Sequence, residues 1–311
     1  MDTIIVTPRS LSKGGHPFLE RVTAAGFVLA FPSPGTQPTE AQLEAVMADA
    51  VGWIAGVERI GASLLAKAPR LRAISRNGTG VDNVDLAAAS ARGIKVLRAE
   101  GANARGVAEL AFGQVLAAAR GLCAADAELK AGRWTRAKGF ELEGKTLGLV
   151  GCGKIGRLVA RFALAFDMRV MAFDPYPDSS FAPSPNFAWT TLAELLAGAD
   201  LISLHCPPAP GGLPVLGAPE FAALKKGVVI VNTARASLVD TAALTAALAS
   251  GAVGTYTVDA FDQEPPSDWS LVKNPRVMAT PHIGGFTDES IDRATEVAVD
   301  NLLAALKGSG Q

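Results

Sequence analysis

The stretch Thr146-Leu-Gly-Leu-Val-Gly-Cys-Gly-Lys-Ile-Gly156 decides the fold of this chain. Its first five residues are typical of a buried strand, and Gly151, Gly153 and Gly156 then match the G-x-G-x-x-G pattern at the start of a helix. A helix-like stretch at 157–166 and a second strand ending in Asp174 follow. The whole unit predicts a dinucleotide-binding strand–turn–helix–strand, although the same pattern also occurs as a plain structural turn.

Each glycine in this loop has a physical role. Gly151 permits the tight turn, Gly153 lets a pyrophosphate approach the backbone, and Gly156 lets the helix pack against the strand. Backbone N–H groups at the helix start would hold the pyrophosphate. The Asp174 carboxylate can accept hydrogen bonds from the adenosine ribose, and no Arg or Lys follows in 175–178 to receive a 2′-phosphate. The loop therefore predicts NAD rather than NADP as the cofactor.

Strand-like and helix-like stretches alternate on both sides of this loop. Such alternation predicts an α/β fold with parallel sheets covered on both faces, and the length predicts two domains. In the first hundred residues we expect strands at 3–7, 27–31, 51–55, 71–76 and 94–97, and helices at 17–25, 39–49, 62–68 and 85–92. Further on we expect strands at 146–150, 169–174, 201–205, 228–232, 256–259 and 277–280, and long helices at 104–122 and 288–307.

The composition excludes several classes of protein. Of the 311 residues, 49% are hydrophobic and 19% are charged, which is ordinary for a globular protein with buried cores. Lys and Arg total 29 against 30 Asp and Glu, so the net charge of −1 gives no field that attracts nucleic acid or anionic membranes. No run reaches the ~18 apolar residues of a membrane span. We expect neither nucleic acid nor membrane as a partner.

The three cysteines, Cys123, Cys152 and Cys206, lack the spacing of a metal site. We expect them to be reduced thiols in a cytoplasmic protein that holds no metal. The first nine residues reach Pro8 after only a short apolar run, so we expect no signal peptide.

Polar residues follow three of the expected strands, in the segments 232–235, 258–266 and 280–285. Because ligands gather beyond the carboxyl ends of parallel strands, we expect these segments to converge beside the nicotinamide. Hydride transfer to a ketone needs a proton donor, and His282 is the natural candidate. Glu264 would orient its imidazole, and Arg235 offers a planar fork suited to a carboxylate.

Each of these three residues also has a structural interpretation. His282 would then be an ordinary loop histidine, Arg235 would pair with Asp240, and Glu264 would be a solvated carboxylate before Pro265. Their joint occurrence after a nucleotide-binding loop favours the catalytic interpretation.

Ordered segments along nearly the whole chain match one family. They are Arg76-Asn-Gly-Thr-Gly-Val-Asp-Asn-Val-Asp85, Gly101-Ala-Asn-Ala-Arg-Gly-Val-Ala-Glu109, the glycine-rich loop, Asn232-Thr-Ala-Arg-Ala-Ser-Leu-Val-Asp240, Val258-Asp-Ala-Phe-Asp-Gln-Glu-Pro-Pro266 and Thr280-Pro-His-Ile-Gly-Gly285. The sequence thereby resembles the D-isomer-specific 2-hydroxyacid dehydrogenases, and the segment 76–80 is most similar to 3-phosphoglycerate dehydrogenases.

The resemblance implies a role for each matching residue. His282 would be the proton donor or acceptor, Glu264 its partner, and Arg235 the anchor for the carboxylate and C2 oxygen of the substrate. The implied cofactor-binding residues are Thr79, Gly151, Gly153, Lys154, Ile155, Gly156, Asp174, Cys206, Pro207, Thr233, Asp259 and Gly284.

On the substrate side, the resemblance implies that backbone N–H groups of Asn77, Gly78 and Thr79 grip the substrate carboxylate. Arg76 matches a position that contacts substrate phosphate in phosphoglycerate dehydrogenases, but it would equally serve as a surface residue at a strand end. The substrate is therefore expected to be a small 2-hydroxy or 2-oxo acid, either 3-phosphoglycerate or an unphosphorylated acid such as glyoxylate or hydroxypyruvate. Relatives that oxidise formate carry Gln where this chain has Glu264, so that activity is disfavoured.

The resemblance also implies the architecture. A Rossmann cofactor domain, 102–283, would be inserted into a flavodoxin-like substrate domain, 1–101 and 284–311, with the active site in the cleft between them. Family members are usually homodimers, in which the segment near 132–134 forms part of an arm. Two alternatives stay open: a dinucleotide-sensing protein similar to the C-terminal-binding corepressors, and phosphite oxidation on a similar scaffold.

Overall fold

The computed structural model describes residues 2–209 and 211–307. The chain divides into two compact units, which we call unit 1 (Met1–Asn103 with Thr287–Gln311) and unit 2 (Ala104–Phe286). Unit 2 is thus inserted into the sequence of unit 1. The boundaries expected from the sequence, at 101 and 284, differ from these limits by a few residues.

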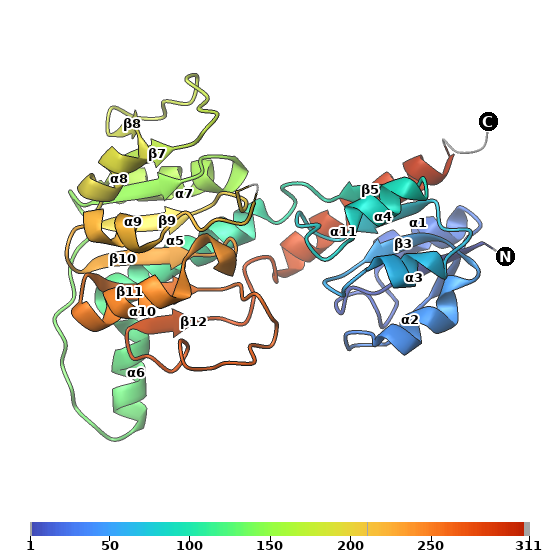
Figure 1. Cartoon of the computed structure of the whole chain (residues 1–311), viewed down its shortest axis with the longest axis horizontal. Coiled ribbons are helices and arrows are strands. Elements are labelled where there is room, and N and C mark those ends of the chain that lie inside the picture. Colours follow the sequence, from blue (N-terminus) through green and yellow to red (C-terminus); the bar gives the residue numbers. More distant parts are fainter. Residues whose placement is uncertain (1, 210, 308–311) are drawn as a thin grey trace. The chain divides into compact units, whose positions relative to one another are not determined.

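Unit 1 is a five-stranded parallel sheet with helices on both faces (Figure 1). In the sheet the strands lie in the order β2-β1-β3-β4-β5. Their bounds are β1 Thr3–Val6, β2 Val28–Ala30, β3 Ala50–Ala55, β4 Ala73–Arg76 and β5 Lys95–Arg98. One face is packed by α2 (Glu40–Met47), α3 (Ala62–Ala66) and α4 (Leu86–Ala91), and the other by α1 (Pro17–Ala24) and α11 (Asp288–Lys307).

Unit 2 is a seven-stranded parallel sheet in the order β12-β11-β10-β9-β6-β7-β8. The strands are β6 Thr146–Val150, β7 Arg169–Phe173, β8 Phe187–Trp189, β9 Leu201–Leu204, β10 Val228–Asn232, β11 Val253–Val258 and β12 Val277–Ala279. One face is packed by α5 (Ala104–Arg120) and α7 (Lys154–Ala165), and the other by α8 (Leu192–Gly198), α9 (Ala218–Ala223) and α10 (Thr241–Ser250). A 3-10 turn (Ala236–Leu238) follows β10, and α6 (Leu122–Lys130) follows α5.

Burial explains why these strands read as continuous apolar runs. Every residue of β3, β6, β9 and β10 is buried, since helices cover both faces of each sheet. The predicted α/β fold class, with two doubly wound parallel sheets, is confirmed.

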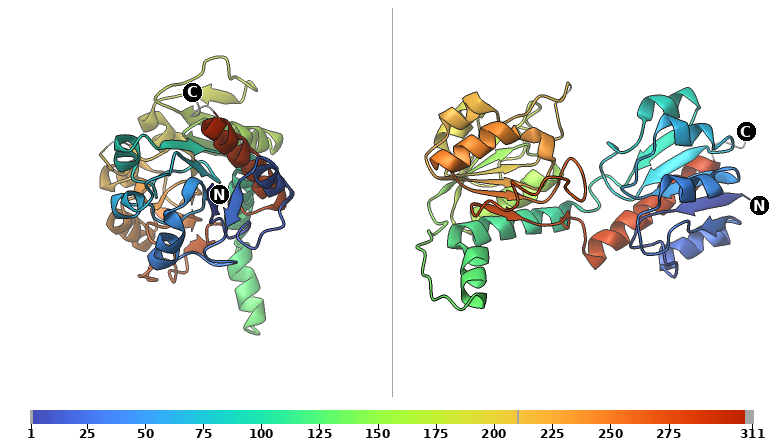
Figure 2. Two further views of the ribbon diagram at one scale, coloured as in Figure 1. Left: turned by 90° about the vertical axis from the view of Figure 1, so that its right-hand side faces the viewer. Right: turned by 60° about the horizontal axis from the view of Figure 1, so that its bottom comes forward.

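The predicted single helix at 104–122 is wrong at its end. Gly121 adopts a left-handed backbone conformation with φ +60°, which ends α5 at Arg120. The helix α6 then leaves at an angle of 63° to α5 (Figure 2). Among the described helices none is by itself long and apolar enough to cross a membrane; α5 and α6 meet that criterion only as this bent pair, by length and composition.

Candidate active site

The glycine-rich loop lies where the strand order of unit 2 reverses, because β6 is flanked by β7 on one side and β9 on the other. At such a point the connections of neighbouring strands leave toward opposite faces, which opens a crevice at the carboxyl ends of the strands. Gly151 follows β6 directly, and Lys154 and Ile155 form the first turn of α7. The loop therefore occupies the position where open α/β sheets bind ligands.

The three glycines of this loop differ in their surroundings. A Cβ atom on Gly151 would lie 2.6 Å from the Cys206 nitrogen, and its φ is +91°. A Cβ atom on Gly156 would lie 2.4 Å from the carbonyl oxygen of Gly151. A Cβ atom on Gly153 would meet nothing within 4 Å. Two glycines thus serve packing, and the third leaves space at the start of α7, as a bound pyrophosphate requires.

Asp174 follows β7 and fixes the glycine-rich loop. Its carboxylate accepts hydrogen bonds from the backbone N–H groups of Cys152, at 3.0 Å, and of Tyr176, also at 3.0 Å. Burial raises the pKa of the Cys152 thiol to about 12, despite the nearby Arg157. The carboxylate therefore lies beside the loop, while this cysteine is a neutral packing residue.

On the other side of the crevice, Cys206 and Pro207 follow β9, and Thr233 follows β10. Thr233 is 9% exposed, and its buried Oγ1 atom has no hydrogen-bond partner among the described residues. A buried hydroxyl without a partner is costly, so this atom is suited to bind a ligand group. These features, with the open space at Gly153, fit a dinucleotide.

Glu264 and His282 are in direct contact. The Nδ1 atom of His282 lies 2.7 and 2.9 Å from the two carboxylate oxygens of Glu264. Burial raises the pKa of Glu264, but the hydrogen bonds from His282 and from the Phe261 N–H, with the charge of Arg235, lower it overall. Glu264 is therefore a carboxylate near neutral pH, and it leaves Nε2 of His282 as the ring atom that can face a ligand.

Arg235 leaves the sheet just after β10. The buried Asn232 shapes this turn, because its side chain donates to the Arg235 carbonyl oxygen at 2.8 Å and accepts from the Ala234 N–H. The Arg235 guanidinium donates to the Ala234 carbonyl oxygen at 2.8 Å and lies close enough to Glu264 to lower its pKa. Asp240, the alternative partner considered from the sequence, caps α10 through the Ala243 N–H.

Asp259 holds the loop that carries His282, which is a role the sequence did not reveal. Its carboxylate accepts hydrogen bonds from the N–H groups of Ile283 and Gly284, at 2.9 and 2.8 Å, and from the Thr280 hydroxyl at 2.6 Å. The loop needs this support, since His282 has a φ of +54°, which is unusual for a residue other than glycine.

The Thr280 hydroxyl is held in turn by Gln114 of α5. The Gln114 amide donates to it at 3.2 Å and accepts from the buried Thr257 hydroxyl at 2.8 Å. A buried amide with both ends bonded costs little and fixes the side chains it joins. Gln114 therefore links α5 to the histidine loop.

In unit 1, β4 ends at Arg76, and the segment 77–79 follows it. The Arg76 guanidinium donates to the carbonyl oxygens of Ala55 and Asn77, at 3.4 and 3.1 Å. The Thr79 hydroxyl lies 3.3 Å from Asn103 Oδ1. The side-chain oxygen of Asn77 is buried without a hydrogen-bond partner among the described residues. Arg76 thus stabilises the start of the loop.

Glu58, which the sequence analysis missed, is buried beside this loop. It is 2% exposed and accepts hydrogen bonds from the Thr7 hydroxyl and from the Gly56 N–H, the latter at 3.0 Å. Burial raises the pKa of Glu58, and the bond from Thr7 and the charge of Arg76 offset only part of that rise. An acidic side chain therefore lies within the electrostatic reach of Arg76.

His205 is a further titratable group whose pKa is shifted. His205 is half-buried, its Nε2 atom lies 2.9 Å from the Ser203 hydroxyl, and desolvation lowers its pKa to about 4. Across residues 2–209 and 211–307, no three His, Cys, Asp or Glu side chains gather closely enough to hold a metal ion.

Comparison with known proteins shows that the sequence of this chain matches one family. The family model for the NAD binding domain of D-isomer specific 2-hydroxyacid dehydrogenases matches residues 112–284. D-3-phosphoglycerate dehydrogenase of Mycobacterium tuberculosis is 42% identical over 251 residues, which cover 80% of this chain and 48% of that protein. The chain spans about half the length of the curated relatives it matches.

Solved structures extend the likeness over both units. A crystal structure of a Thermus thermophilus protein is 37% identical with a TM-score of 0.87, covering 98% of this chain and 97% of that one. A glyoxylate reductase from Paecilomyes thermophila is 28% identical with a TM-score of 0.86, covering 99% and 96%. The segment matched by the family model includes the glycine-rich loop, Arg235, Glu264 and His282.

Proposed function

The chain belongs to the D-isomer-specific 2-hydroxyacid dehydrogenase family, and on this premise we propose that it interconverts a D-2-hydroxy acid and its 2-oxo acid with NAD. The observation that carries the proposal is the contact between Glu264 and Nδ1 of His282 in the same unit as the glycine-rich loop. An imidazole held at one nitrogen by a carboxylate presents the other nitrogen for proton transfer.

In this mechanism NAD, when bound, supplies or accepts the hydride. His282 donates a proton from Nε2 to the carbonyl oxygen during reduction and takes it back during oxidation. Glu264 keeps the ring in place through its contact with Nδ1. Arg235 binds the substrate carboxylate through its planar fork, which sets the orientation of the carbonyl carbon.

The test is NADH oxidation with a panel of 2-oxo acids, beside NAD reduction with D-3-phosphoglycerate. Turnover of any member, abolished in the Arg235→Ala variant, would support the proposal. Tight NADH binding without turnover of any acid would contradict it and favour a dinucleotide-sensing protein. The control for Arg235→Ala is Arg161→Ala, which replaces an exposed arginine of α7. This control is expected to leave turnover unchanged.

Among substrates, we favour an unphosphorylated acid such as glyoxylate or hydroxypyruvate over 3-phosphoglycerate. The supporting observation is that Arg76, the expected phosphate ligand, donates from its guanidinium to the carbonyl oxygens of Ala55 and Asn77. Selective turnover of D-3-phosphoglycerate would overturn this choice.

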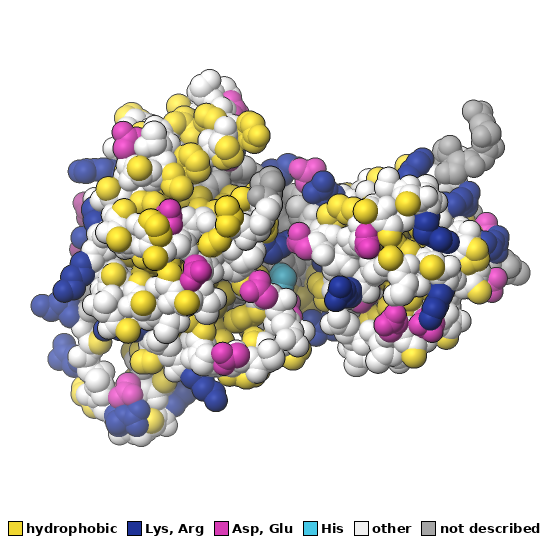
Figure 3. Space-filling model, viewed as in Figure 1, with side chains coloured by type: hydrophobic (Ala, Val, Ile, Leu, Met, Phe, Trp, Pro, Cys, Tyr) yellow, Lys and Arg dark blue, Asp and Glu magenta, His cyan; other side chains and the backbone are white. Residues whose placement is uncertain are grey.

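We also propose a homodimer built on α6 and the segment that follows it. None of the residues of α6 is buried, and Leu122, Leu129 and Trp134 are large apolar side chains that are 55%, 56% and 83% exposed. Beside them, charged side chains of both signs cluster where α6 ends in unit 2 (Figure 3), as in the Lys130–Asp126 pair at 2.6 Å.

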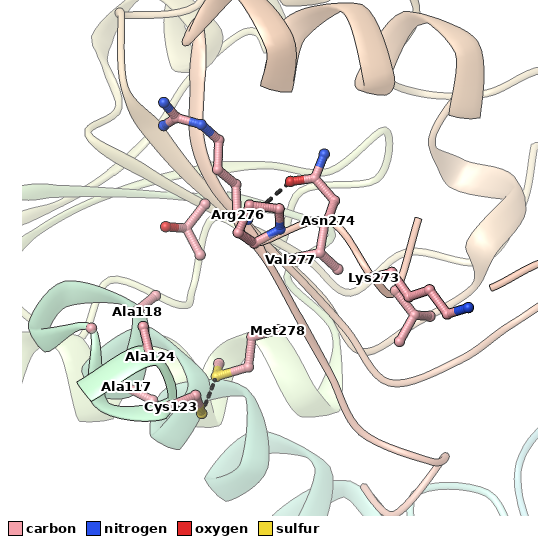
Figure 4. A pocket seen from close by; sticks show the side chains of 13 residues that line it. Ala117, Ala118, Cys123, Ala124, Lys273, Asn274, Arg276, Val277 and Met278 are labelled. Atoms are coloured by element: carbon pink, nitrogen blue, oxygen red, sulfur yellow. Dashed lines mark hydrogen bonds between the residues drawn. The ribbon is translucent and has the colours of Figure 1, made fainter. Parts of the chain in front are cut away.

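The base of α6 borders a hollow in unit 2 (Figure 4). Cys123 contacts Met278 of β12 there, with their sulfur atoms 3.2 Å apart, and Arg276 lines the same hollow.

Light scattering after size exclusion tests the proposal of a homodimer. We expect a dimer for the wild type and a monomer for Leu129→Ser combined with Trp134→Ser, and a monomeric wild type would contradict it.

A further inference from the structure

An arginine and an aspartate meet beside the carboxylate expected to hold the adenosine ribose. Arg157 lies on the first half of α7, and its Nη2 atom is 2.8 Å from Oδ2 of Asp178 in the loop between β7 and β8. The guanidinium also lies over the ring of Phe181, 4.9 Å from its centre. The mechanism proposed above uses neither charged residue.

This pair is joined to Asp174 through one residue of the glycine-rich loop. The Cys152 N–H donates to Asp174 at 3.0 Å, and the Cys152 carbonyl oxygen accepts from Nε of Arg157 at 3.2 Å. The guanidinium and the carboxylate that would bind the ribose hydroxyls are therefore bonded to the same residue of the loop. In the sequence a cation for a 2′-phosphate was expected only directly after Asp174, whereas Arg157 lies on α7.

The turn that contains Asp178 orients its carboxylate toward Arg157. Its Oδ1 atom accepts hydrogen bonds from the Ser180 N–H at 3.0 Å and from the Ser180 hydroxyl at 2.6 Å, which leaves Oδ2 for the arginine. The bonds from Ser180 and then from Arg157 lower the pKa of Asp178, so it is ionised near neutral pH. The loop thus supplies a fixed negative charge.

We propose that Asp178 strengthens the preference of this chain for NAD over NADP by holding Arg157 away from a 2′-phosphate on the adenosine ribose. The inference rests on the proposed binding of NAD in unit 2. An arginine close to the ribose is the group that accommodates a 2′-phosphate in dinucleotide-binding folds. Here Asp178 occupies its guanidinium, while Asp174 repels the phosphate directly.

The expected effect is moderate, because both side chains of the pair are partly exposed, 37% for Arg157 and 41% for Asp178. Freeing one guanidinium for a charge-assisted hydrogen bond is expected to strengthen NADPH binding about tenfold. NADH would remain the tighter ligand, since Asp174 is unchanged.

The experiment is titration of the full chain with NADH and NADPH by calorimetry, without substrate. The variant is Asp178→Asn, which removes the charge and keeps an oxygen to accept the bonds from Ser180. We expect its affinity for NADPH to rise about tenfold and its affinity for NADH to change less than about twofold. The matched control is Asp268→Asn, because Asp268 makes the same turn with Ser270 and has no contact with Arg157 among the described residues.

The double variant Asp178→Asn with Arg157→Gln separates release of the arginine from simple loss of negative charge. The gain for NADPH is expected to disappear in it, and a gain that persists would overturn the proposal. An unchanged NADPH affinity in Asp178→Asn, with NADH still bound, would overturn this inference alone. If the wild type bound neither dinucleotide, the cofactor assignment itself would be wrong and this inference with it.

Discussion

The loops that follow two central parallel strands, β6 in unit 2 and β4 in unit 1, are built in different ways. The loop after β6 in unit 2 has no side-chain cap at Gly153 and leaves space at the start of a twelve-residue helix. The loop after β4 in unit 1 follows Arg76, the last residue of that strand, whose guanidinium is bonded to carbonyl oxygens of two segments. The first leaves its backbone open to a ligand, and the second is shaped by side chains.

This difference explains why the cofactor was easier to predict than the substrate. A backbone site needs glycines at fixed spacing, and that spacing is visible in the sequence. A side-chain site depends on which groups lie near each other after folding, as Arg76 and Glu58 do. The following experiments test how far the two loops differ.

The largest effect is expected at His282, in the unit with the backbone site. His282→Ala should lower kcat/KM about 10²–10⁴-fold, the usual contribution of a general acid–base, with little change in NADH affinity. The control is His16→Ala, which removes a histidine that contacts Asp292 at 3.1 Å in unit 1. Equal losses in the two variants would show that proton transfer is not the cause.

The second test separates packing from ligand recognition within the glycine-rich loop. Gly156→Ala should destabilise the protein by about 1–3 kcal/mol, because the new Cβ would meet a backbone oxygen at 2.4 Å. Gly153→Ala should leave the melting temperature unchanged and still weaken NADH binding about tenfold, since its Cβ enters the space left for the pyrophosphate. Thermal unfolding and NADH titration of both variants give the answer, and a destabilised Gly153→Ala would contradict the distinction.

The third test concerns the loop after β4. If Arg76 serves the loop, Arg76→Gln should raise KM for glyoxylate and for phosphohydroxypyruvate by the same factor, about fivefold for a lost hydrogen bond. If Arg76 binds phosphate, only KM for the phosphorylated acid should rise. Steady-state kinetics with both acids distinguish the two roles, and a selective rise would make the two loops more alike than we infer.

The elements that the sequence predicted best are those with a strong apolar pattern. The expected strands at 146–150 and 228–232 and the helix at 288–307 have the bounds of β6, β10 and α11. The edge strand β8 was missed, since it has three residues and only Phe187 among them is buried. The helix α10 was missed because most of its side chains, in Thr241–Ser250, are small, so the buried face formed by Leu244, Ala247 and Leu248 contrasts little with the rest of the helix.

The partner of a site residue was predictable from the sequence where its side chain has one usual partner, and was not predictable where the side chain can bond many different groups. Glu264 and His282 were expected to form a pair, and the structure places them in contact. Asp259 was expected beside the nicotinamide, and the structure shows its carboxylate bonded to the loop of His282. The partners of an aspartate depend on the path of distant segments, which periodicity does not report.

The smallest expected effect is the dependence of stability on the Glu264–His282 contact. Because the folded-state pKa of Glu264 lies below its ordinary value of 4.5, its charge adds stability at neutral pH that is lost as the pH falls through the folded-state pKa. The side chains are 33% and 43% exposed, so solvent screening limits the contribution to less than about 1 kcal/mol. Urea unfolding should therefore show Glu264→Gln slightly less stable than the wild type near neutral pH and equal to it at a pH well below that value. A stability difference between the wild type and Glu264→Gln that grew toward acid pH would mean that folding stabilises the protonated carboxyl. Glu264 would then hold His282 by packing and neutral hydrogen bonding rather than by charge.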